Sequence, residues 1–189
     1  MNVIAIIPAK TDSIRLKKKN LKIINNKSLV QHSIEYALNS KYIKEIYIST
    51  ESDEVKKIAS QFNVSILERN PKLMGKAEVV EVYIDSMTEI KKISKLSKID
   101  IVVGIQPDHP DRQLNIDRAI DYFIENTYDD LFTVDSTGTR NGSIRITKSA
   151  HVISGKMSHR VGSLVDNCTN IHDDNDLIMA ENNINEKND

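Results

Sequence analysis

The sequence predicts one three-layer α/β/α domain with a mostly parallel sheet, and three observations support this fold class. Short apolar runs alternate along the chain with amphipathic segments of helix length. Strands that are separated by helices imply right-handed crossovers, which place neighbouring strands parallel. The 189 residues suffice for one hydrophobic core, and 39% hydrophobic with 28% charged residues is typical of a globular protein.

The first predicted strand is the apolar run Val3–Ile7, which ends at Pro8. An uninterrupted apolar run is typical of a central parallel strand that is buried on both faces. Ser28 and Gln31 have the spacing of a capping box, so a helix is expected from there to about Asn39. Further strands are expected at Glu45–Ser49, Val64–Leu67, Ile101–Ile105 and Leu131–Val134.

Three more helices are predicted from apolar residues that recur three and four positions apart. They are expected over Val55–Phe62, Ala77–Leu96 and Ile116–Phe123. After residue 134 the pattern is less regular: Ser143–Thr147 and His151–Ser154 have the composition of short strands, and Asp174–Ile184 that of a last helix. No linker or repeat divides the chain, so residues 1–184 are expected to form a single domain, followed by a polar tail at 185–189.

Composition and charge argue against several classes of protein. Lys and Arg number 26 against 27 Asp and Glu, a formal net charge of −1, so no nucleic-acid partner is predicted. The apolar runs are much shorter than a membrane span, and the first residues lack the features of a signal peptide. A single cysteine, Cys168, suits a reducing compartment, so a cytoplasmic protein without a membrane partner is expected.

The loop after the first predicted strand carries a high density of positive charge, opposed there by Asp12. In open α/β sheets ligands bind at the carboxyl ends of the strands, and several cations at that place suit a triphosphate. The loop contains no glycine, so it is neither a Walker loop nor a dinucleotide fingerprint. The alternative is a solvated lysine run on an exposed loop. The cations are Lys10, Arg15, Lys17, Lys18, Lys19 and Lys22.

Six segments, taken together, resemble one family of enzymes. They are Pro8–Asn20, Ile48–Glu54, Arg69–Leu73, Ile105–Arg112, Arg140–Ile144 and Asp176–Glu181. The first is similar to the pattern P-A-R-x-x-S-x-R-x-x-x-K-N, the fourth to L-Q-P-T-S-P-L-R and the fifth to R-x-N-G-A-I. These are patterns of the cytidylyltransferases that activate acidic sugars, the CMP-N-acylneuraminate, legionaminate, pseudaminate and Kdo synthetases. The chain resembles a divergent and shortened member of this family.

The resemblance implies the Rossmann-like nucleotide-diphospho-sugar transferase fold and transfer of CMP from CTP to a sialic-acid-type sugar acid, with release of pyrophosphate. It implies that Arg15 and Lys19 stabilise the charge that grows on the departing pyrophosphate. It also implies that Gln106 and Asn141 bind the sugar. The residues implied to bind the nucleotide are Lys10, Ser13, Arg15, Lys19, Asn20 and Arg69.

Several positions depart from the family pattern. Lys10 stands in place of an arginine, so the charge is kept while the bidentate guanidinium is lost. Asp12 brings a negative charge toward the expected phosphates, and the segment from Gly75 lacks the family's acid and hydroxyl groups. Arg145 stands where the family usually has an aromatic residue. It either faces an acidic sugar or is an ordinary polar residue on a strand. The family's insertion between positions 134 and 141 is largely missing, so a smaller acceptor site is expected and a homodimer stays open.

The resemblance also implies Mg²⁺, held in the family by two aspartates near the C-terminal end of the pattern. Asn170 and His172 stand at those two positions here, and neither is a good Mg²⁺ ligand. The candidate ligands are therefore Asp108, in a Q-P-D-H-P segment similar to the Q-G-D-E-P of Kdo enzymes, and the adjacent Asp173 and Asp174. The alternative for Asp108 is a turn residue that caps the next helix, and for His172 a solvated loop residue or a ligand of a softer metal.

Three functions remain open on the sequence alone. The first is a working cytidylyltransferase. The second is a nucleotide-binding or nucleotide-sugar-binding protein that has lost turnover together with the family's metal aspartates. The third is a structural domain on the same fold, with its lysine loop exposed to solvent.

Overall fold

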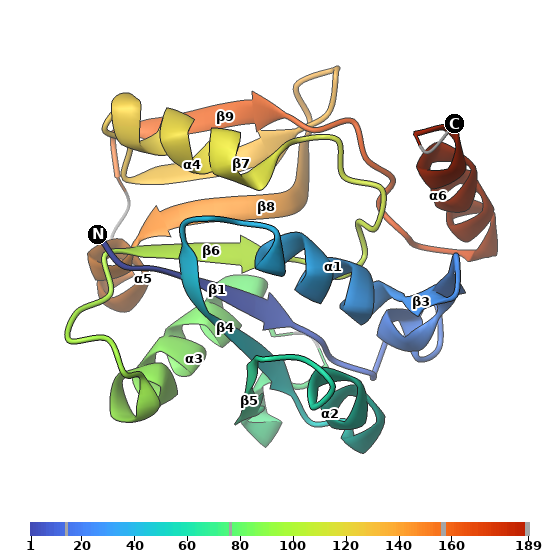
Figure 1. Ribbon diagram of the computed structural model, residues 1–189, viewed down its shortest axis with the longest axis horizontal. Helices are drawn as coiled ribbons and strands as arrows, with labels where there is room; N and C mark the ends of the chain where they lie inside the picture. Colours follow the sequence, from blue (N-terminus) through green and yellow to red (C-terminus); the bar gives the residue numbers. More distant parts are fainter. Residues whose placement is uncertain (14, 76, 156–157, 188–189) are drawn as a thin grey trace.

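In residues 1–13, 15–75, 77–155 and 158–187, which the computed structural model describes, helices cover both faces of a seven-stranded sheet, beside which lies a two-stranded hairpin (Figure 1). The strands are β1 Val3–Pro8, β2 Ile23–Ile24, β3 Lys27–Ser28, β4 Ile43–Thr50, β5 Ser65–Glu68, β6 Ile101–Ile105, β7 Asp130–Val134, β8 Arg140–Lys148 and β9 Val161–Val165. The helices are α1 Leu29–Leu38, α2 Asp53–Ala59, α3 Val79–Ile93, α4 Ile116–Glu125, α5 Ser149–Ser154 and α6 Asp174–Glu186, with 3₁₀ turns η1 Lys19–Leu21 and η2 Pro71–Leu73.

The large sheet has the order β5-β4-β1-β6-β8-β7-β9, and only β8 runs antiparallel to its neighbours among these strands. The predicted mostly parallel α/β/α architecture is therefore confirmed. β1 is central: Ala5 is in register with Ile46 of β4 on one side and with Val103 of β6 on the other. The carboxyl ends of β1, β4 and β6 consequently point to the same edge of the sheet (Figure 1).

Alternation along β1 divides the core into two layers. Val3, Ala5 and Ile7 pack with apolar residues of α1, α2 and α4, whereas Ile4 and Ile6 pack with those of α3 and α5. All five side chains are fully buried, as the uninterrupted apolar run predicts for a strand covered on both faces. Burying apolar surface contributes about 25 cal/mol per Å² to folding, so this run is a main source of stability.

The predicted starts of α1 and α4 are confirmed, whereas α2 begins two residues before the predicted Val55 and ends at Ala59, before the predicted Phe62. The Ser28 side chain accepts a hydrogen bond from the Gln31 amide at the start of α1. A complete capping box would also have the Gln31 side chain bonded to the Ser28 backbone N–H. Here the Gln31 side chain instead donates to Glu35, one turn later. Ser52 and Asn115 cap α2 and α4 in the same way as Ser28.

The segment after β7 contains the main errors of the sequence prediction. His151–Ser154, expected as a strand, belongs to helix α5, where Val152 packs against the core beneath α3. Gly155 ends this helix in a left-handed conformation, the usual helix terminator. Strand β9 is absent from the sequence prediction, because Val161–Val165 alternates only weakly and contains Gly162, a residue that is uncommon inside strands. In the structure the ring of Tyr128 packs closely on Gly162.

α6 begins at the predicted Asp174 but continues to Glu186, past the expected Ile184. Its polar end is tied to the domain: the Asn183 amide donates to Asp111, and Lys187 Nζ donates to the Asp111 carbonyl oxygen, both at 2.7 Å. On its other side, apolar residues of α6 and the segment before it pack on the β2–β3 hairpin and the first loop. The buried members of this cluster are Leu16, Ile24, Leu29, Ile171 and Ala180.

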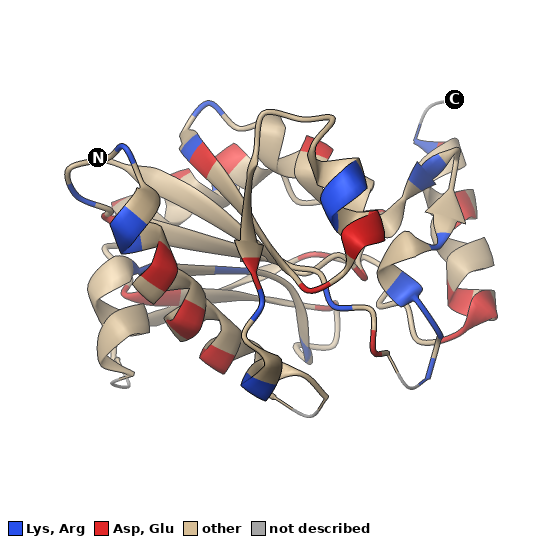
Figure 2. Cartoon of the chain, turned by 90° about the horizontal axis from the view of Figure 1, so that it is seen from below, with Lys and Arg blue, Asp and Glu red and all other residues tan. Residues whose placement is uncertain are grey.

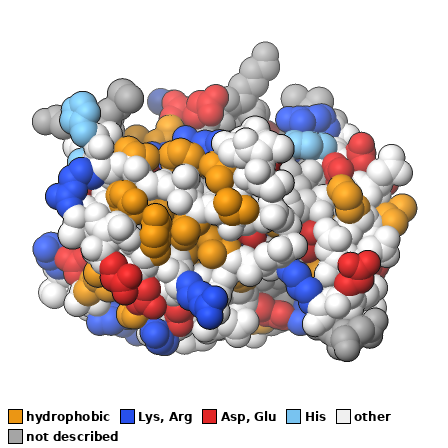
Figure 3. Space-filling view, turned by 90° about the horizontal axis from the view of Figure 1, so that it is seen from above, with side chains coloured by type: hydrophobic (Ala, Val, Ile, Leu, Met, Phe, Trp, Pro, Cys, Tyr) orange, Lys and Arg blue, Asp and Glu red, His pale blue; other side chains and the backbone are white. Residues whose placement is uncertain are grey.

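Charged residues of both signs are mixed over the helices and loops in Figure 2, and the strands carry few of them. Figure 3, seen from the side of α4 and β9, shows hydrophobic side chains gathered on that face. Ile124, Val161 and Val165 are among the exposed apolar residues of these two elements. Among the helices of the described residues, none combines the length and the apolar character that crossing a membrane requires.

Candidate active site

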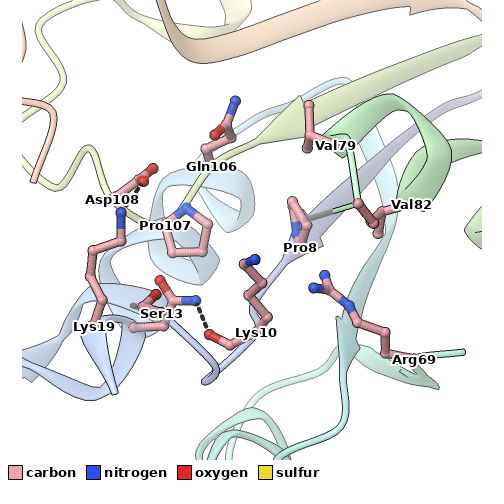
Figure 4. Close-up of a pocket in the computed structure, with 12 residues that line it drawn as sticks. Pro8, Lys10, Ser13, Lys19, Arg69, Val79, Val82, Gln106, Pro107 and Asp108 are labelled. Carbon is pink, nitrogen blue, oxygen red and sulfur yellow. Dashed lines mark hydrogen bonds and ion pairs between the residues drawn. The ribbon is translucent and has the colours of Figure 1, made fainter. Parts of the chain in front are cut away.

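A pocket opens at the carboxyl ends of β1 and β6, where the sequence analysis expects the ligand (Figure 4). The loop after β1 lines one side, the turn after β6 another, and the residues after β5 and at the start of α3 complete it. Segments that are far apart in sequence meet here because parallel strands end at one edge of the sheet. The lining residues are Pro8, Lys10, Ser13, Lys19, Asn20, Arg69, Ala77, Val79, Val82, Gln106, Pro107 and Asp108.

Two anchors shape the cationic first loop. Leu16 is buried in the cluster beneath α6, and Asn20, also buried, donates its side-chain amide to the Lys10 carbonyl oxygen at 2.7 Å. Between these anchors Lys17 and Lys18 are exposed, whereas Lys19 turns inward to the pocket. The loop is therefore not a uniformly solvated lysine run.

Lys19 forms an ion pair with Asp108 across the pocket. Its Nζ lies 2.5 Å from Asp108 Oδ2 and 3.0 Å from the Ile171 carbonyl oxygen, and each charged side chain is about one-sixth exposed. His109, which is buried, places Nδ1 3.1 Å from the other carboxylate oxygen. Burial opposes the charged form of Asp108, but His109 and Lys19 outweigh burial and lower its pKa. Asp108 is therefore an ionised carboxylate inside a cationic pocket.

Arg69 enters the pocket from the end of β5, facing Lys10 (Figure 4). Its side chain is 3% exposed, and Nη2 donates to the Ser49 carbonyl oxygen at 3.2 Å. Burial lowers the pKa of Arg69, and the nearby carboxylates of Glu51 and Asp12 act in the opposite direction. Nε also donates to Ser49 Oγ at 3.5 Å, so two of the five guanidinium donors are used within the protein and the others stay available for a ligand in the pocket.

Lys10 is engaged by the segment that follows β5. Its Nζ donates to the Gly75 carbonyl oxygen at 2.6 Å and lies 3.4 Å from Asp12 Oδ1. The other oxygen of Asp12 accepts from the Gly75 amide. Gly75 has a φ of +69°, which glycine adopts without strain. Three of the departures from the family pattern thus bind one another, and we call this contact of Lys10 and Asp12 with Gly75 the Gly75 clasp.

Gln106 stands between this pocket and a second one along β8. Both pockets are lined by Gln106 and Val79, and the second is also lined by Arg140, Gly142 and Arg145. Gly142 has a φ of +78°, and a Cβ added there would lie 2.8 Å from Gln106 Nε2. The absence of a side chain at Gly142 therefore makes room for the Gln106 amide.

The two arginines of the second pocket have different surroundings. Arg145 binds Asp130 through two hydrogen bonds of 2.8 and 2.6 Å, an ion pair within the sheet. This pairing raises the pKa of Arg145, and it agrees with the interpretation of this residue as strand polarity. Arg140 lies over the ring of Phe132, with Cζ 4.4 Å from its centroid, and is exposed.

Asn141, the second residue implied to bind the sugar, is held by the protein itself. Its side-chain oxygen accepts from Thr133 Oγ1 at 2.6 Å and from the Ser143 amide, while its nitrogen donates to the Asp166 carbonyl oxygen at 2.7 Å. The amide joins β7, β8 and the segment after β9. In this arrangement Asn141 shapes the strand beneath Gln106.

Arg15 lies next to the first pocket rather than in it. Together with Lys10, Ser13 and Lys19 it lines a neighbouring depression that also includes His172. Arg15 Nη1 lies 3.0 Å from His172 Nδ1, so a positively charged group faces this imidazole. The depression continues the cationic surface of the first loop away from Gln106.

The candidate metal ligands are not brought together. Asp173 caps α6, accepting from the Asn175 and Asp176 amides, and Asp174 is exposed and lies 3.3 Å from Lys22 Nζ. Within the described ranges no three His, Cys, Asp or Glu side chains are grouped so that they could hold a metal ion. Asp108 alone lies in the pocket, which still fits Mg²⁺, because this ion is commonly held by one or two carboxylates together with substrate phosphates.

Sequence reasoning missed the buried polar groups behind the pocket, namely Arg112, Asp166 and His109. Arg112 and His109 belong to the quoted Ile105–Arg112 segment, but nothing in their spacing indicated burial. Asp166 accepts hydrogen bonds from the Ser143 side chain and from the backbone amides of Gln113 and Leu114. It thereby ties the end of β9 to β8 and to the segment before α4.

Residues 4–187 match the protein family described as Cytidylyltransferase. The chain is 27% identical over 157 residues to 3-deoxy-manno-octulosonate cytidylyltransferase 2 of Hydrogenovibrio crunogenus, covering 82% of this chain and 58% of that protein. It is 30% identical over 115 residues to CMP-N,N'-diacetyllegionaminic acid synthase of Legionella pneumophila, covering 60% of this chain and 49% of that protein. The chain thus spans about half the length of these curated relatives.

The fold is shared with a solved CMP:2-keto-3-deoxy-manno-octonic acid synthetase in complex with CTP. The TM-score is 0.75 at 13% identity, and the match covers 99% of this chain and 100% of that one. A 4-diphosphocytidyl-2C-methyl-D-erythritol synthase of Anaerococcus prevotii gives a TM-score of 0.67 at 10% identity, covering 97% and 96%. At these identities the similarity establishes the fold alone.

Proposed function

Because the chain belongs to the cytidylyltransferase family, we propose that it transfers a cytidylyl group from CTP to a hydroxyl of a sugar acid and releases pyrophosphate. The relatives named above carry out reactions with acids of this class, as their names state. The observation that carries the proposal is the convergence of Lys10, Lys19 and Arg69 on one pocket that also contains Gln106.

The proposed mechanism relies on positioning and electrostatics, without a covalent enzyme intermediate. The acceptor hydroxyl attacks the α-phosphorus of CTP and loses its proton to water, a new P–O bond forms, and the bond from the α-phosphorus to the bridging oxygen breaks, so that this oxygen leaves with pyrophosphate. Lys10, Lys19 and Arg69 hold the triphosphate, and Ser13 and Asn20 complete the loop around it. The departing pyrophosphate gains negative charge, which Lys19 and Arg15 stabilise from the depression beside the pocket.

We infer that Asp108 would hold Mg²⁺ in this pocket, since one or two protein carboxylates commonly suffice for this ion when it binds together with substrate phosphates. The ion supplies charge neutralisation for the triphosphate when it is bound. Asp173 and Asp174 are left out of this assignment, because one caps a helix and the other pairs with Lys22. The acceptor is assigned to the second pocket, where Gln106 faces it from the nucleotide side and Arg140 supplies an exposed positive charge for its carboxylate.

The test is a pyrophosphate-release assay on the purified chain, with CTP, UTP, ATP and GTP each combined with a panel of eight- and nine-carbon sugar acids. Release with CTP and one acid class is expected, with calorimetry giving Mg²⁺-dependent CTP binding. CTP binding without release for any acid would support a nucleotide-binding protein that has lost turnover. No binding of any nucleotide would contradict both, and would leave a structural domain with an exposed loop.

Gly142→Ala is expected to weaken acceptor binding while leaving CTP binding unchanged, because the new Cβ meets the Gln106 amide. Gly138→Ala is the matched control: its φ of +83° imposes a similar backbone strain of about 1–2 kcal/mol, but nothing lies within 4 Å of the added Cβ. Both variants should lose similar thermal stability, whereas only Gly142→Ala should raise the acceptor KM. An equal KM effect of the two would show that backbone strain, and not Gln106, is responsible.

Asp12→Asn is expected to tighten CTP binding by up to about tenfold, or about 1.4 kcal/mol. The asparagine keeps an oxygen for the Gly75 amide but removes a negative charge that lies 3.4 Å from Lys10 Nζ. Calorimetry at low and high salt measures this, since an electrostatic gain shrinks as salt rises. Asp53→Asn, at an exposed carboxylate on α2, provides the control and should leave the affinity unchanged.

A further inference from the structure

We propose that Arg112 is a positioning residue that fixes Gln106 at the junction of the nucleotide and acceptor pockets. The inference rests on the proposed function, in which Gln106 contacts the acceptor. Arg112 lies six residues after Gln106, behind the pocket, and its side chain is about nine-tenths buried. It is absent from the lining of both pockets, so any influence on the reaction acts through another residue.

The Arg112 guanidinium joins three elements. Nη2 donates to the carbonyl oxygen of Gln106 itself, at the end of β6, and lies 3.3 Å from the carbonyl oxygen of Ser143 on β8. Nη1 lies 3.3 Å from Ser33 Oγ on α1. The guanidinium also lies over the ring of Tyr36, with Cζ 5.0 Å from its centroid.

The surroundings of this guanidinium indicate a positioning role. Within the described part of the chain no Asp or Glu side chain forms an ion pair with Arg112. Its charge is instead spread over two carbonyl oxygens and a hydroxyl, which require the fixed fork of a guanidinium. A buried charge is costly to keep, and an apolar side chain in its place would leave the carbonyl oxygens without donors.

These bonds fix the main chain from which the Gln106 side chain projects. The backbone N–H of Gln106 donates to the Ser143 carbonyl oxygen at 3.3 Å, so the same oxygen accepts hydrogen bonds from both Gln106 and Arg112. Gly142, the residue before Ser143, leaves space for the side-chain amide of Gln106. Arg112 therefore fixes the backbone of Gln106 and also the segment of β8 against which the Gln106 side chain packs.

Arg112→Lys is the main test, with Arg118→Lys on the exposed side of α4 as control. A lysine keeps the charge but offers one ammonium in place of the fork, so it cannot serve Gln106, Ser143 and Ser33 together. A displacement of about 1 Å at a reacting group can cost about 10²-fold in rate. We expect kcat/KM for the sugar acid to fall at least tenfold, with the Kd for CTP changed less than twofold and Arg118→Lys unchanged. Equal losses for CTP and acceptor, or no loss, would overturn the proposal.

A second measurement does not depend on turnover. In the ¹⁵N-labelled protein the side-chain amide signals of Gln106, assigned with Gln106→Glu, should shift and sharpen in Arg112→Lys, while those of Gln31 and Gln61 stay in place. Unchanged Gln106 signals would overturn the positioning role even if the wild-type chain releases no pyrophosphate, a result that by itself contradicts only the proposed function. If Arg112→Lys fails to fold, Ser33→Ala removes one of the three contacts and should give the same shift at smaller amplitude; no shift there would overturn the proposal.

Discussion

Lys19→Ala should weaken CTP binding by about 10- to 100-fold, whereas Lys17→Ala, two residues away in the same loop, should change it less than twofold. A hydrogen bond from a charged donor contributes about 1.5–3 kcal/mol, which corresponds to this range of affinity. Lys19 also pairs with Asp108, so in the absence of Mg²⁺ its removal leaves that carboxylate with His109 as its neighbour, and the negative charge repels phosphate. Lys17 is exposed, so its removal lowers only the overall positive charge of the loop. Calorimetry with CTP, in the presence and in the absence of Mg²⁺, measures both constants.

The two contributions of Lys19 are separated by a double-mutant cycle with Asp108→Asn. If loss of the phosphate contact dominates, CTP binding stays weak in the double variant. If the unpaired carboxylate dominates, Asp108→Asn restores much of the affinity in the Lys19→Ala background. Equal and small effects of Lys17→Ala and Lys19→Ala would contradict the phosphate-binding role of the loop as a whole.

Asp108→Asn should lower kcat/KM by about 10²-fold or more and raise the Mg²⁺ concentration needed for half-maximal rate, since an amide is a poorer ligand than a carboxylate. Asp174→Asn is the control, because that carboxylate is exposed and pairs with Lys22 away from the pocket. A normal Mg²⁺ dependence in Asp108→Asn would remove Asp108 from the metal site.

The same substitution has a pH signature in stability. The folded protein lowers the pKa of Asp108, so ionised Asp108 stabilises the fold above its unfolded pKa of about 4, and this contribution is lost as the pH falls. Asp108→Asn should therefore cost most free energy of unfolding near neutral pH and progressively less below pH 4. Denaturant unfolding at several pH values measures the difference; a cost that is constant with pH would show that the carboxylate charge is not the stabilising element.

The strands of the parallel half of the sheet were predictable because their burial leaves a direct trace in the sequence. Val3–Ile7 and Ile101–Ile105 are apolar at nearly every position, as residues covered on both faces must be. The antiparallel half left a weaker trace. The short helix α5 contains Val152 and Ile153, which are β-formers by propensity, and tertiary packing of Val152 overrides that preference.

The site was predictable to the extent that it depends on chain direction. Lys10, Lys19, Arg69 and Gln106 converge because each follows a parallel strand, and strand ends meet. What the sequence did not indicate is how the side chains pair. Asp173 caps the helix whose start at Asp174 was predicted, but the prediction did not distinguish a capping carboxylate from a metal ligand; the burial of Arg112 depends on contacts with α1 and β8.

The Gly75 clasp has a consequence for the free energy of the proposed nucleotide binding. A phosphate oxygen that recruits the Lys10 ammonium competes with a hydrogen bond that this ammonium already donates to the backbone. The net gain is then the difference between two hydrogen bonds, smaller than the full strength of a new one. If the pocket binds the triphosphate as proposed, uptake at this corner is an exchange of one hydrogen bond for another, and the affinity for the ligand depends on how freely the two loops joined by the clasp can move.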